Sequence, residues 1–133
     1  MKKELFFEDE FIEIAYLSEK NIIYTARKGY PTLDKVKESL EHSYECLVKY
    51  QSQKVLSDMT QLQGTFTFAN EWVTGVWLPK ALQAGLKYVA YVYSEDVFSR
   101  FALDDLMKKM TNFEMQVFKC KEEALQWLDE VDK

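Results

Sequence analysis

The sequence is poor in the residues that interrupt regular structure, with only 4 glycines and 2 prolines among 133 residues. Long irregular loops are therefore not expected, because glycine and proline dominate turns and loops. Clusters of basic residues are lacking too: no basic run is longer than Lys108-Lys109, and the net charge is −5. Proteins that bind nucleic acid or an anionic membrane surface need such clusters, so neither partner is expected.

Residues that could ligate a metal are few and scattered. The single histidine, His42, lies two positions from both Leu40 and Tyr44 and is expected on the solvated side of a helix. Cys46 and Cys120 lie 74 positions apart (120 − 46) and predict free thiols in a reducing compartment, with a disulfide or a reactive thiol as the alternative. Together with the scattered acids they show no metal-ligand spacing, so no metal or other cofactor is expected.

Long hydrophobic runs are absent as well. No apolar stretch approaches the ~20 residues that a membrane span requires. Glu4, Glu8 and Asp9 interrupt the apolar segment that a signal peptide would need, so a cytoplasmic protein is expected. With 47% apolar residues, the chain is long enough to bury a core, and we expect a single domain over residues 1–133.

The spacing of the apolar residues predicts an α/β fold. Three β-prone segments near the N-terminus, separated by short polar connections, favour an antiparallel meander: 4–8, 11–17 and 21–27. Further along, short apolar runs alternate with stretches of helical period, as is typical of parallel βαβ units: 86–93, 96–110, 115–118 and 122–128. The expected architecture is a mixed sheet of about six strands, an antiparallel meander followed by parallel βαβα units, with about four helices.

Local signals place the elements between these two regions. Thr32 is expected to cap the first helix. Val55–Met59 predicts a strand and 61–68 a loop, after which Asn70 is expected to cap a second helix. Pro79 cannot donate a backbone hydrogen bond, so a break or kink of that helix is expected just before it.

Three stretches look familiar in combination: Val55–Met59, Trp72–Pro79 with the strand that follows Gly85, and Phe118 with the terminal Ala124-Leu-Gln-Trp127-Leu128. Together they resemble the STAS/SpoIIAA-like group of small bacterial domains, within the STAS–SEC14-like fold. The resemblance spans about residues 3–131 and implies a mixed sheet with packed helices and a binding or regulatory role. STAS domains that act as anti-sigma-factor antagonists carry a phosphorylatable serine at a helix start. Here Thr67-Phe-Ala-Asn70 lacks it, which argues against that switch, although Thr65 and Thr67 offer hydroxyls in the region.

Polar side chains are expected at the carboxyl ends of the parallel strands, where ligands bind in open α/β sheets. Ser57, Asp58 and Thr60 would line one rim, with Ser94, Glu95 and Asp96 on a neighbouring strand end. Alternatively, Asp58 satisfies loop amides, and Ser94 or Asp96 caps the next helix. An enzyme using Asp58 as acid or base would need a second catalytic group, and none is evident, so no catalytic residue is expected.

Aromatic residues make up 15% of the sequence and gather in two places. One group lies on the loop and second helix and the other on the strand after them: Phe66, Phe68, Trp72 and Trp77, then Tyr88, Tyr91 and Tyr93. Core packing, an apolar ligand pocket and a partner or dimer surface all account for such groups.

The function expected from these patterns is a non-catalytic protein- or ligand-binding module with an unknown partner. We expect its contact surface at loop 60–70 and helix 70–78, with Phe66, Phe68 and Trp72 as candidates and with possible homodimer contacts. The alternative is a small carrier of an apolar or amphipathic ligand, which predicts a connected apolar cavity on the order of a few hundred Å³.

Overall fold

The computed structural model describes residues 2–111 and 113–133 and shows one six-stranded sheet in the order β1-β2-β3-β4-β5-β6. The strands are β1 (Lys3–Glu8), β2 (Ile12–Leu17), β3 (Ile22–Gly29), β4 (Lys54–Leu62), β5 (Tyr88–Val92) and β6 (Glu114–Phe118). The helices are α1 (Leu33–Tyr50), α2 (Thr67–Trp72), the π-helical turn η1 (Val73–Trp77), α3 (Leu78–Gln83), α4 (Val97–Lys109) and α5 (Lys121–Glu130). Within these described residues, no helix is both long and apolar enough to cross a membrane.

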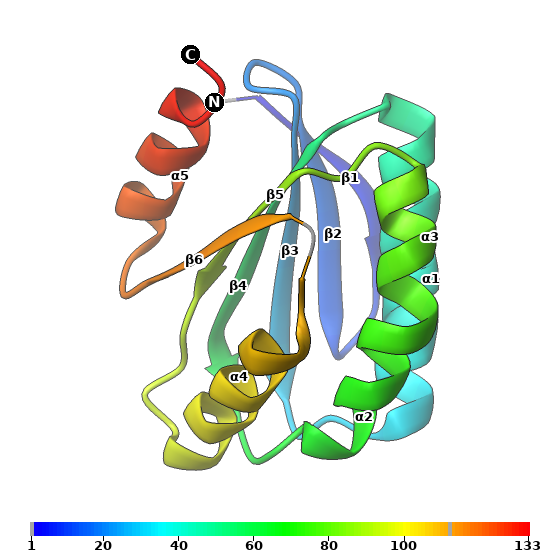
Figure 1. The fold of residues 1–133 in the computed structure, drawn as a ribbon, viewed down its shortest axis with the longest axis vertical. Helices are drawn as coiled ribbons and strands as arrows, with labels where there is room; N and C mark the ends of the chain where they lie inside the picture. The colour runs from blue at the N-terminus through cyan, green and yellow to red at the C-terminus, as the bar shows by residue number, and fades with distance from the viewer. Residues whose placement is uncertain (1, 112) are drawn as a thin grey trace.

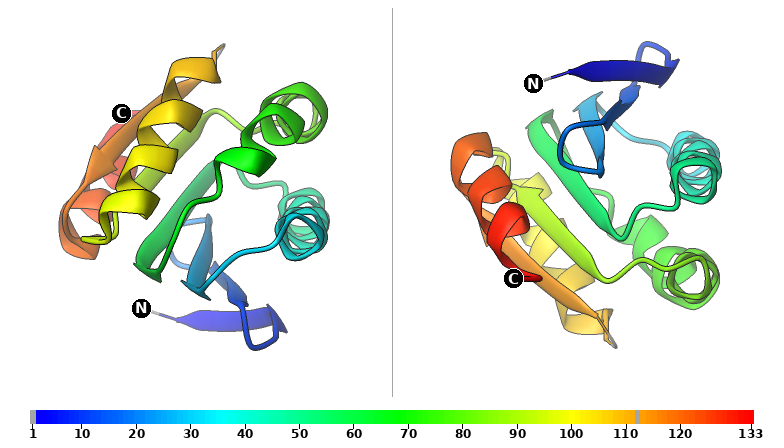
Figure 2. Two further views of the ribbon diagram at one scale, coloured as in Figure 1. Left: turned by 90° about the horizontal axis from the view of Figure 1, so that it is seen from below. Right: turned by 90° about the horizontal axis from the view of Figure 1, so that it is seen from above.

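The direction of the strands explains how the helices are arranged. β1, β2 and β3 form an antiparallel meander, whereas β3, β4, β5 and β6 are parallel neighbours in chain order. A right-handed crossover between parallel strands that always step in the same direction places every connecting helix on the same face. The helices α1, α2–η1–α3 and α4 accordingly share one face, and α5, which follows β6, lies on the other (Figures 1 and 2). The predicted mixed α/β sheet is confirmed.

Two apolar cores fill the space on either side of the sheet. The larger one lies between the sheet and the three connecting helical segments and includes Ile14, Leu47 and Leu103. The smaller one lies beneath α5 and includes Leu56 and Leu128. Successive residues of each strand point to opposite faces, so Val55 of β4 belongs to the larger core and Leu56 to the smaller one.

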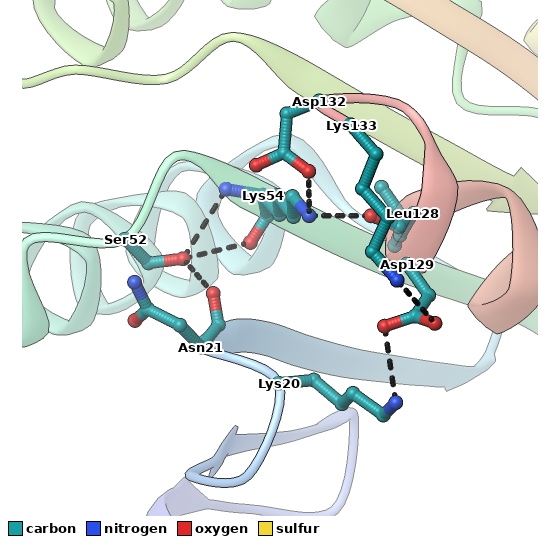
Figure 3. Close-up of polar contacts among 8 residues, drawn as sticks. All are labelled: Lys20, Asn21, Ser52, Lys54, Leu128, Asp129, Asp132 and Lys133. Atoms are coloured by element: carbon teal, nitrogen blue, oxygen red, sulfur yellow. Dashed lines mark hydrogen bonds and ion pairs between the residues drawn. The ribbon is translucent and has the colours of Figure 1, made fainter.

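Salt bridges join the end of α5 and the residues after it to the β2–β3 turn and to the start of β4. Lys20 in the β2–β3 turn lies 3.0 Å from Asp129, and Lys54 at the start of β4 lies 3.0 Å from Asp132 (Figure 3). Lys54 also donates to the backbone carbonyl of Leu128. The hydrogen bond from Lys20 lowers the pKa of Asp129, and that from Lys54 lowers the pKa of Asp132. The terminal helix is therefore held by charge as well as by apolar packing.

The strand β4 is longer than the sequence predicts. It continues past Met59 to Leu62, so Gln61 belongs to the strand and not to a loop. β3 keeps pairing with this extension after a bulge between Ala26 and Lys28. Because β5 ends at Val92, the extension pairs with β3 on one side and has no paired strand among the described residues on the other. Its exposed side chains are polar, and for that reason its sequence resembles that of a loop.

The second helix also differs from the expectation. It begins at Thr67, so Asn70 does not cap it but lies buried inside its first turns. The predicted break before Pro79 is replaced by the π turn η1, in which the Leu78 amide donates to the Val73 carbonyl five residues earlier. Pro79, which has no N–H to donate, then falls in the first turn of α3, where none is required.

The ends of α1 follow the prediction. Thr32 is the N-cap, and its hydroxyl accepts a hydrogen bond from the Lys35 amide. The helix ends at Tyr50, and Gln51 adopts a left-handed conformation that lets its amide reach the last carbonyls.

Candidate functional site

The predicted rim of Ser57, Asp58 and Thr60 is divided between the two faces of the sheet. Ser57 lies beneath the connecting helices and is buried, whereas Asp58 lies on the α5 face. Consecutive residues of a strand point in opposite directions, so the two side chains cannot share one rim. The expectation that they do is wrong, and each belongs to a different part of the molecule.

Asp58 is the centre of a small polar network on the α5 face. Its Oδ2 accepts a hydrogen bond from the Tyr24 hydroxyl at 3.1 Å, and its Oδ1 accepts from the Thr60 amide at 3.0 Å and the Thr60 hydroxyl at 2.7 Å. Burial, and then the charge of Asp58, raise the pKa of Tyr24, which therefore stays a protonated donor. The network lines a shallow groove of about 280 Å³ that is shared with Glu8, Glu13 and other polar residues.

A second groove, of about 450 Å³, follows the carboxyl ends of β4 and β5. Thr60, Ser94 and Asp96 line it together, as the sequence predicts for that edge. Ser94 is buried and donates to the Leu62 carbonyl at 2.8 Å. Asp96 caps α4 by accepting from the amides of that helix, and the Ser99 amide in particular lowers its pKa. Ser94 and Asp96 therefore have structural roles, which is the alternative that the sequence predicts for this edge.

The aromatic residues of the second helix and its preceding loop separate into buried and exposed sets. Phe66 is only 6% exposed and packs in the larger core, so it cannot belong to a docking surface. Trp77 is also buried, and its indole donates to the Leu40 carbonyl at 2.8 Å. Trp72 is half-buried, with the Lys37 ammonium 5.6 Å from its ring centroid. Phe68 is the exposed member, at 48%.

A cavity of about 70 Å³ lies between the sheet and the connecting helices. Its lining is mostly apolar and comes from β3, β4, β5, α1, the second helix and α4, with Val36, Leu47, Val73, Trp77 and Leu106 among the lining residues. The cavity is smaller than a carrier of a lipid-sized ligand requires. Without a rearrangement of its walls, the cavity accommodates a small molecule but not a lipid-sized ligand.

One row of the sheet brings polar side chains to this cavity. Thr25, Ser57 and Tyr91 are register partners on β3, β4 and β5, and all three line the cavity. The neighbouring row, Ile23, Val55 and Val89, is entirely apolar. Among the described residues, the Tyr91 hydroxyl has only the Met110 sulfur as an acceptor, at 3.4 Å, and burial raises the pKa of Tyr91.

Arg27 lines the same cavity, two residues beyond Thr25 on β3. Its side chain is buried, and one guanidinium nitrogen donates to the Ser39 hydroxyl at 2.6 Å. No carboxylate of the described residues forms an ion pair with it. Burial lowers the pKa of Arg27 to about 10, an effect opposed by Tyr91 and, to a smaller extent, by the charge of Asp9. Arg27 is thus a charged group at neutral pH without a counter-ion in contact.

Asn70 is the second buried polar residue of the cavity lining with unmet hydrogen-bonding capacity. Its amide nitrogen donates to the Ala102 carbonyl and to Asp105, both at 3.0 Å, which fixes the orientation of the side chain. Its Oδ1 is buried and has no partner among the described residues. A buried acceptor without a partner costs about 1–3 kcal/mol, so it calls for a physical explanation.

Neither Arg27 nor Asn70 was identified as a candidate from the sequence, although a signal existed for one of them. Arg27 alternates with Ile23 and Thr25 on β3, so its position predicts the face that meets the helices. For Asn70, the preference of asparagine for helix N-caps predicts a different role, and its burial depends on the packing of α4 against the second helix.

The remaining candidates show no reactive arrangement. The His42 ring lies 3.8 Å from the Phe7 ring, stacked against it, and its Nδ1 is 3.0 Å from Glu45. Cys46 and Cys120 are free thiols, and burial raises the pKa of Cys46 to about 12, which makes it a poor nucleophile. Over residues 2–111 and 113–133, no three His, Cys, Asp or Glu side chains are placed to share a metal ion.

The comparisons with known proteins address the family. No curated protein matches the chain at a significant level. A family model described as SpoIIAA-like matches residues 22–129, from the start of β3 to the last turn of α5. The match therefore includes all four parallel strands and every helix that encloses the cavity. Most of the chain is covered, and the protein belongs to the SpoIIAA-like family.

Proposed function

We propose that this chain is a non-catalytic binding module whose ligand site is the cavity between the sheet and the connecting helices. The observation that carries the proposal is the presence of two buried polar side chains in the lining of one apolar cavity: Arg27, whose guanidinium has the Ser39 hydroxyl as its one side-chain partner among the described residues, and Asn70, whose buried Oδ1 has no partner there. Small-molecule sites have this composition, with mostly apolar walls and a few polar groups that orient the ligand. A purely structural core would place apolar residues at these positions.

Two observations support a binding role without catalysis. The carboxylate of Asp58 already accepts three hydrogen bonds, from Tyr24 and Thr60, so it is occupied as an acceptor. The described residues that line the cavity include no carboxylate or histidine to move a proton. The free thiols Cys46 and Cys120 support a reducing compartment such as the cytoplasm.

A second candidate role, binding of a protein partner, is favoured by exposed apolar side chains. Phe68 is 48% exposed, and α4 presents Val97, Phe98 and Phe101 at 70%, 64% and 67% exposure. Large apolar groups gathered on a surface are typical of interaction sites. If they mediate a homodimer, sedimentation velocity should show a dimer for the native chain and a monomer for Phe98→Ser.

The ligand-site proposal is tested with the intact chain and a cavity-filling variant, Ser57→Leu. Native mass spectrometry of freshly purified protein should show a retained small molecule, or a panel of small fragments should shift the amide resonances of cavity-lining residues. The leucine side chain fills the space next to Thr25 and Tyr91, so Ser57→Leu should remain folded and lose this binding. Thr60→Leu, on the exposed part of the same strand, is the matched control and should bind normally. Fragment binding that is unaffected by Ser57→Leu would place the site elsewhere.

A further inference from the structure

We propose that the cavity binds a small carboxylate and that Arg27 is the residue that holds its negative charge. This inference rests on the proposed ligand site and adds the chemical class of the ligand. It concerns short organic acids of a few carbon atoms, bound with the carboxylate against the guanidinium and the carbon chain against the apolar walls.

The first argument is the unbalanced charge of Arg27. An arginine keeps its charge at neutral pH, and burying a charge without a counter-ion is costly. The nearest acid in electrostatic terms, Asp9, uses its carboxylate elsewhere: Oδ1 accepts from the amides of Phe11 and Ile12, and Oδ2 lies 4.0 Å from Lys35. An anion that enters the cavity would supply the missing counter-charge.

The second argument is the shape of the hydrogen-bonding surface that remains on Arg27. Only Nη1 has a partner, the Ser39 hydroxyl, whereas Nε and Nη2 have none among the described residues. Nε and Nη2 lie along one edge of the guanidinium and match the two oxygens of a carboxylate. The Phe11 ring, with its centroid 6.0 Å from the guanidinium carbon, packs beside the group and helps to hold it.

The third argument is the surroundings of this charge. Beyond Arg27 the lining offers hydroxyls from Thr25, Ser43, Ser57 and Tyr91 and the amide of Asn70, and otherwise apolar side chains. A fully hydrated inorganic anion would lose solvent on all sides and regain hydrogen bonds on only one of them. A carboxylate with a short carbon chain suits both parts of the cavity, because one end is charged and the other is apolar.

The size of the cavity limits the chain length. At roughly 10–15 Å³ for each water-sized group, a volume of 70 Å³ holds about five to seven such groups, and propionate and butyrate have about that number of non-hydrogen atoms. Pro31, which precedes α1, is more exposed than the other described residues of the lining.

The test is a titration of the ¹⁵N-labelled chain at neutral pH and constant ionic strength with sodium butyrate and with butyramide. The two molecules have the same size, and only butyrate is charged. Butyrate should shift the amide resonances of Thr25, Ser57 and Tyr91, and butyramide should bind at least about tenfold more weakly, because a hydrogen bond to a charged partner is lost. Equal binding of the two molecules would overturn the carboxylate assignment.

Two variants separate this inference from the proposed ligand site. Arg27→Met should weaken butyrate binding by at least about tenfold and leave butyramide binding unchanged, whereas Lys28→Met, at an exposed neighbouring position, should change neither. If Arg27→Met does not fold, the comparison of butyrate with butyramide on the native chain decides alone. Neutral fragments that bind and are excluded by Ser57→Leu would keep the ligand site and reject the carboxylate. An absence of binding by every probe would reject both.

Discussion

Replacement of Arg27 by methionine should leave the protein as stable as the native chain or make it more stable. This is unusual for a large, buried side chain, whose substitution normally destabilises a protein. The expectation follows from the state of Arg27 in the absence of a ligand. It is buried, charged and without a carboxylate in contact, so it opposes folding in proportion to the cost of its desolvation.

The size of this effect follows from the pKa. Burial lowers the pKa of Arg27 to about 10, and the fall from its ordinary value corresponds to about 3 kcal/mol at about 1.4 kcal/mol for each pKa unit. The unfolded chain binds more protons above about pH 10, so the penalty is fully present at neutral pH and decreases as the pH rises beyond that value. Methionine removes the penalty but also removes the hydrogen bond to Ser39, worth about 1.5–3 kcal/mol for a charged donor. The net change should therefore lie between zero and about 2 kcal/mol of added stability.

Urea denaturation at neutral pH, followed by circular dichroism, measures this difference. Lys28→Met is the matched control, since it removes an exposed charge from the next position and should stay within about 0.5 kcal/mol of the native chain. A loss of more than about 1 kcal/mol in Arg27→Met would refute the reasoning, because it would show that Arg27 already has a stabilising partner. Added butyrate at ten times its dissociation constant should stabilise the native chain by about 1.4 kcal/mol and leave the variant unchanged.

Three further predictions concern the rest of the fold. Because Lys20 lowers the pKa of Asp129, the stability from this pair is present above about pH 4 and is lost as the pH falls below it. Circular dichroism across this pH range, with a second series in 0.5 M salt for comparison, should show α5 losing its helical structure first. Phe66→Ala should lower the free energy of unfolding by about 3–5 kcal/mol, whereas Phe68→Ala should change it by less than about 0.5 kcal/mol, and equal losses would contradict their different burial. Asn70→Ala removes two hydrogen bonds to α4 and should cost about 2–3 kcal/mol in urea denaturation, and a neutral result would show that these bonds contribute little.

The sequence predicts the sheet well because strand alternation and helical period are local properties. The antiparallel start, the parallel strands and the cap at Thr32 all follow from neighbouring residues. The extension of β4 to Leu62 does not, because it depends on pairing with β3 across a bulge. Likewise, the π turn that accommodates Pro79 reflects the fit of a whole helix against its neighbours.

The candidate site could be predicted less completely, and for two different reasons. Alternation along β4 alone places Ser57 and Asp58 on opposite faces of the sheet, so their separation could be predicted from the sequence. The unused hydrogen-bonding groups of Arg27 and Asn70 could not be predicted in the same way. Whether these groups have hydrogen-bond partners depends on how α1 and α4 pack against the sheet, and that packing is not a local property of the sequence.

The topology explains why the cavity forms on the face that it does. Four parallel strands in chain order, joined by right-handed crossovers, place three helical segments on one face and leave only α5 for the other. The helix-rich face is the one where the polar row of Thr25, Ser57 and Tyr91 meets Arg27. A core needs no polar row, and apolar residues there would be more stable. The polar groups are accordingly concentrated around this cavity, and such concentration is expected when a site is maintained at the expense of stability.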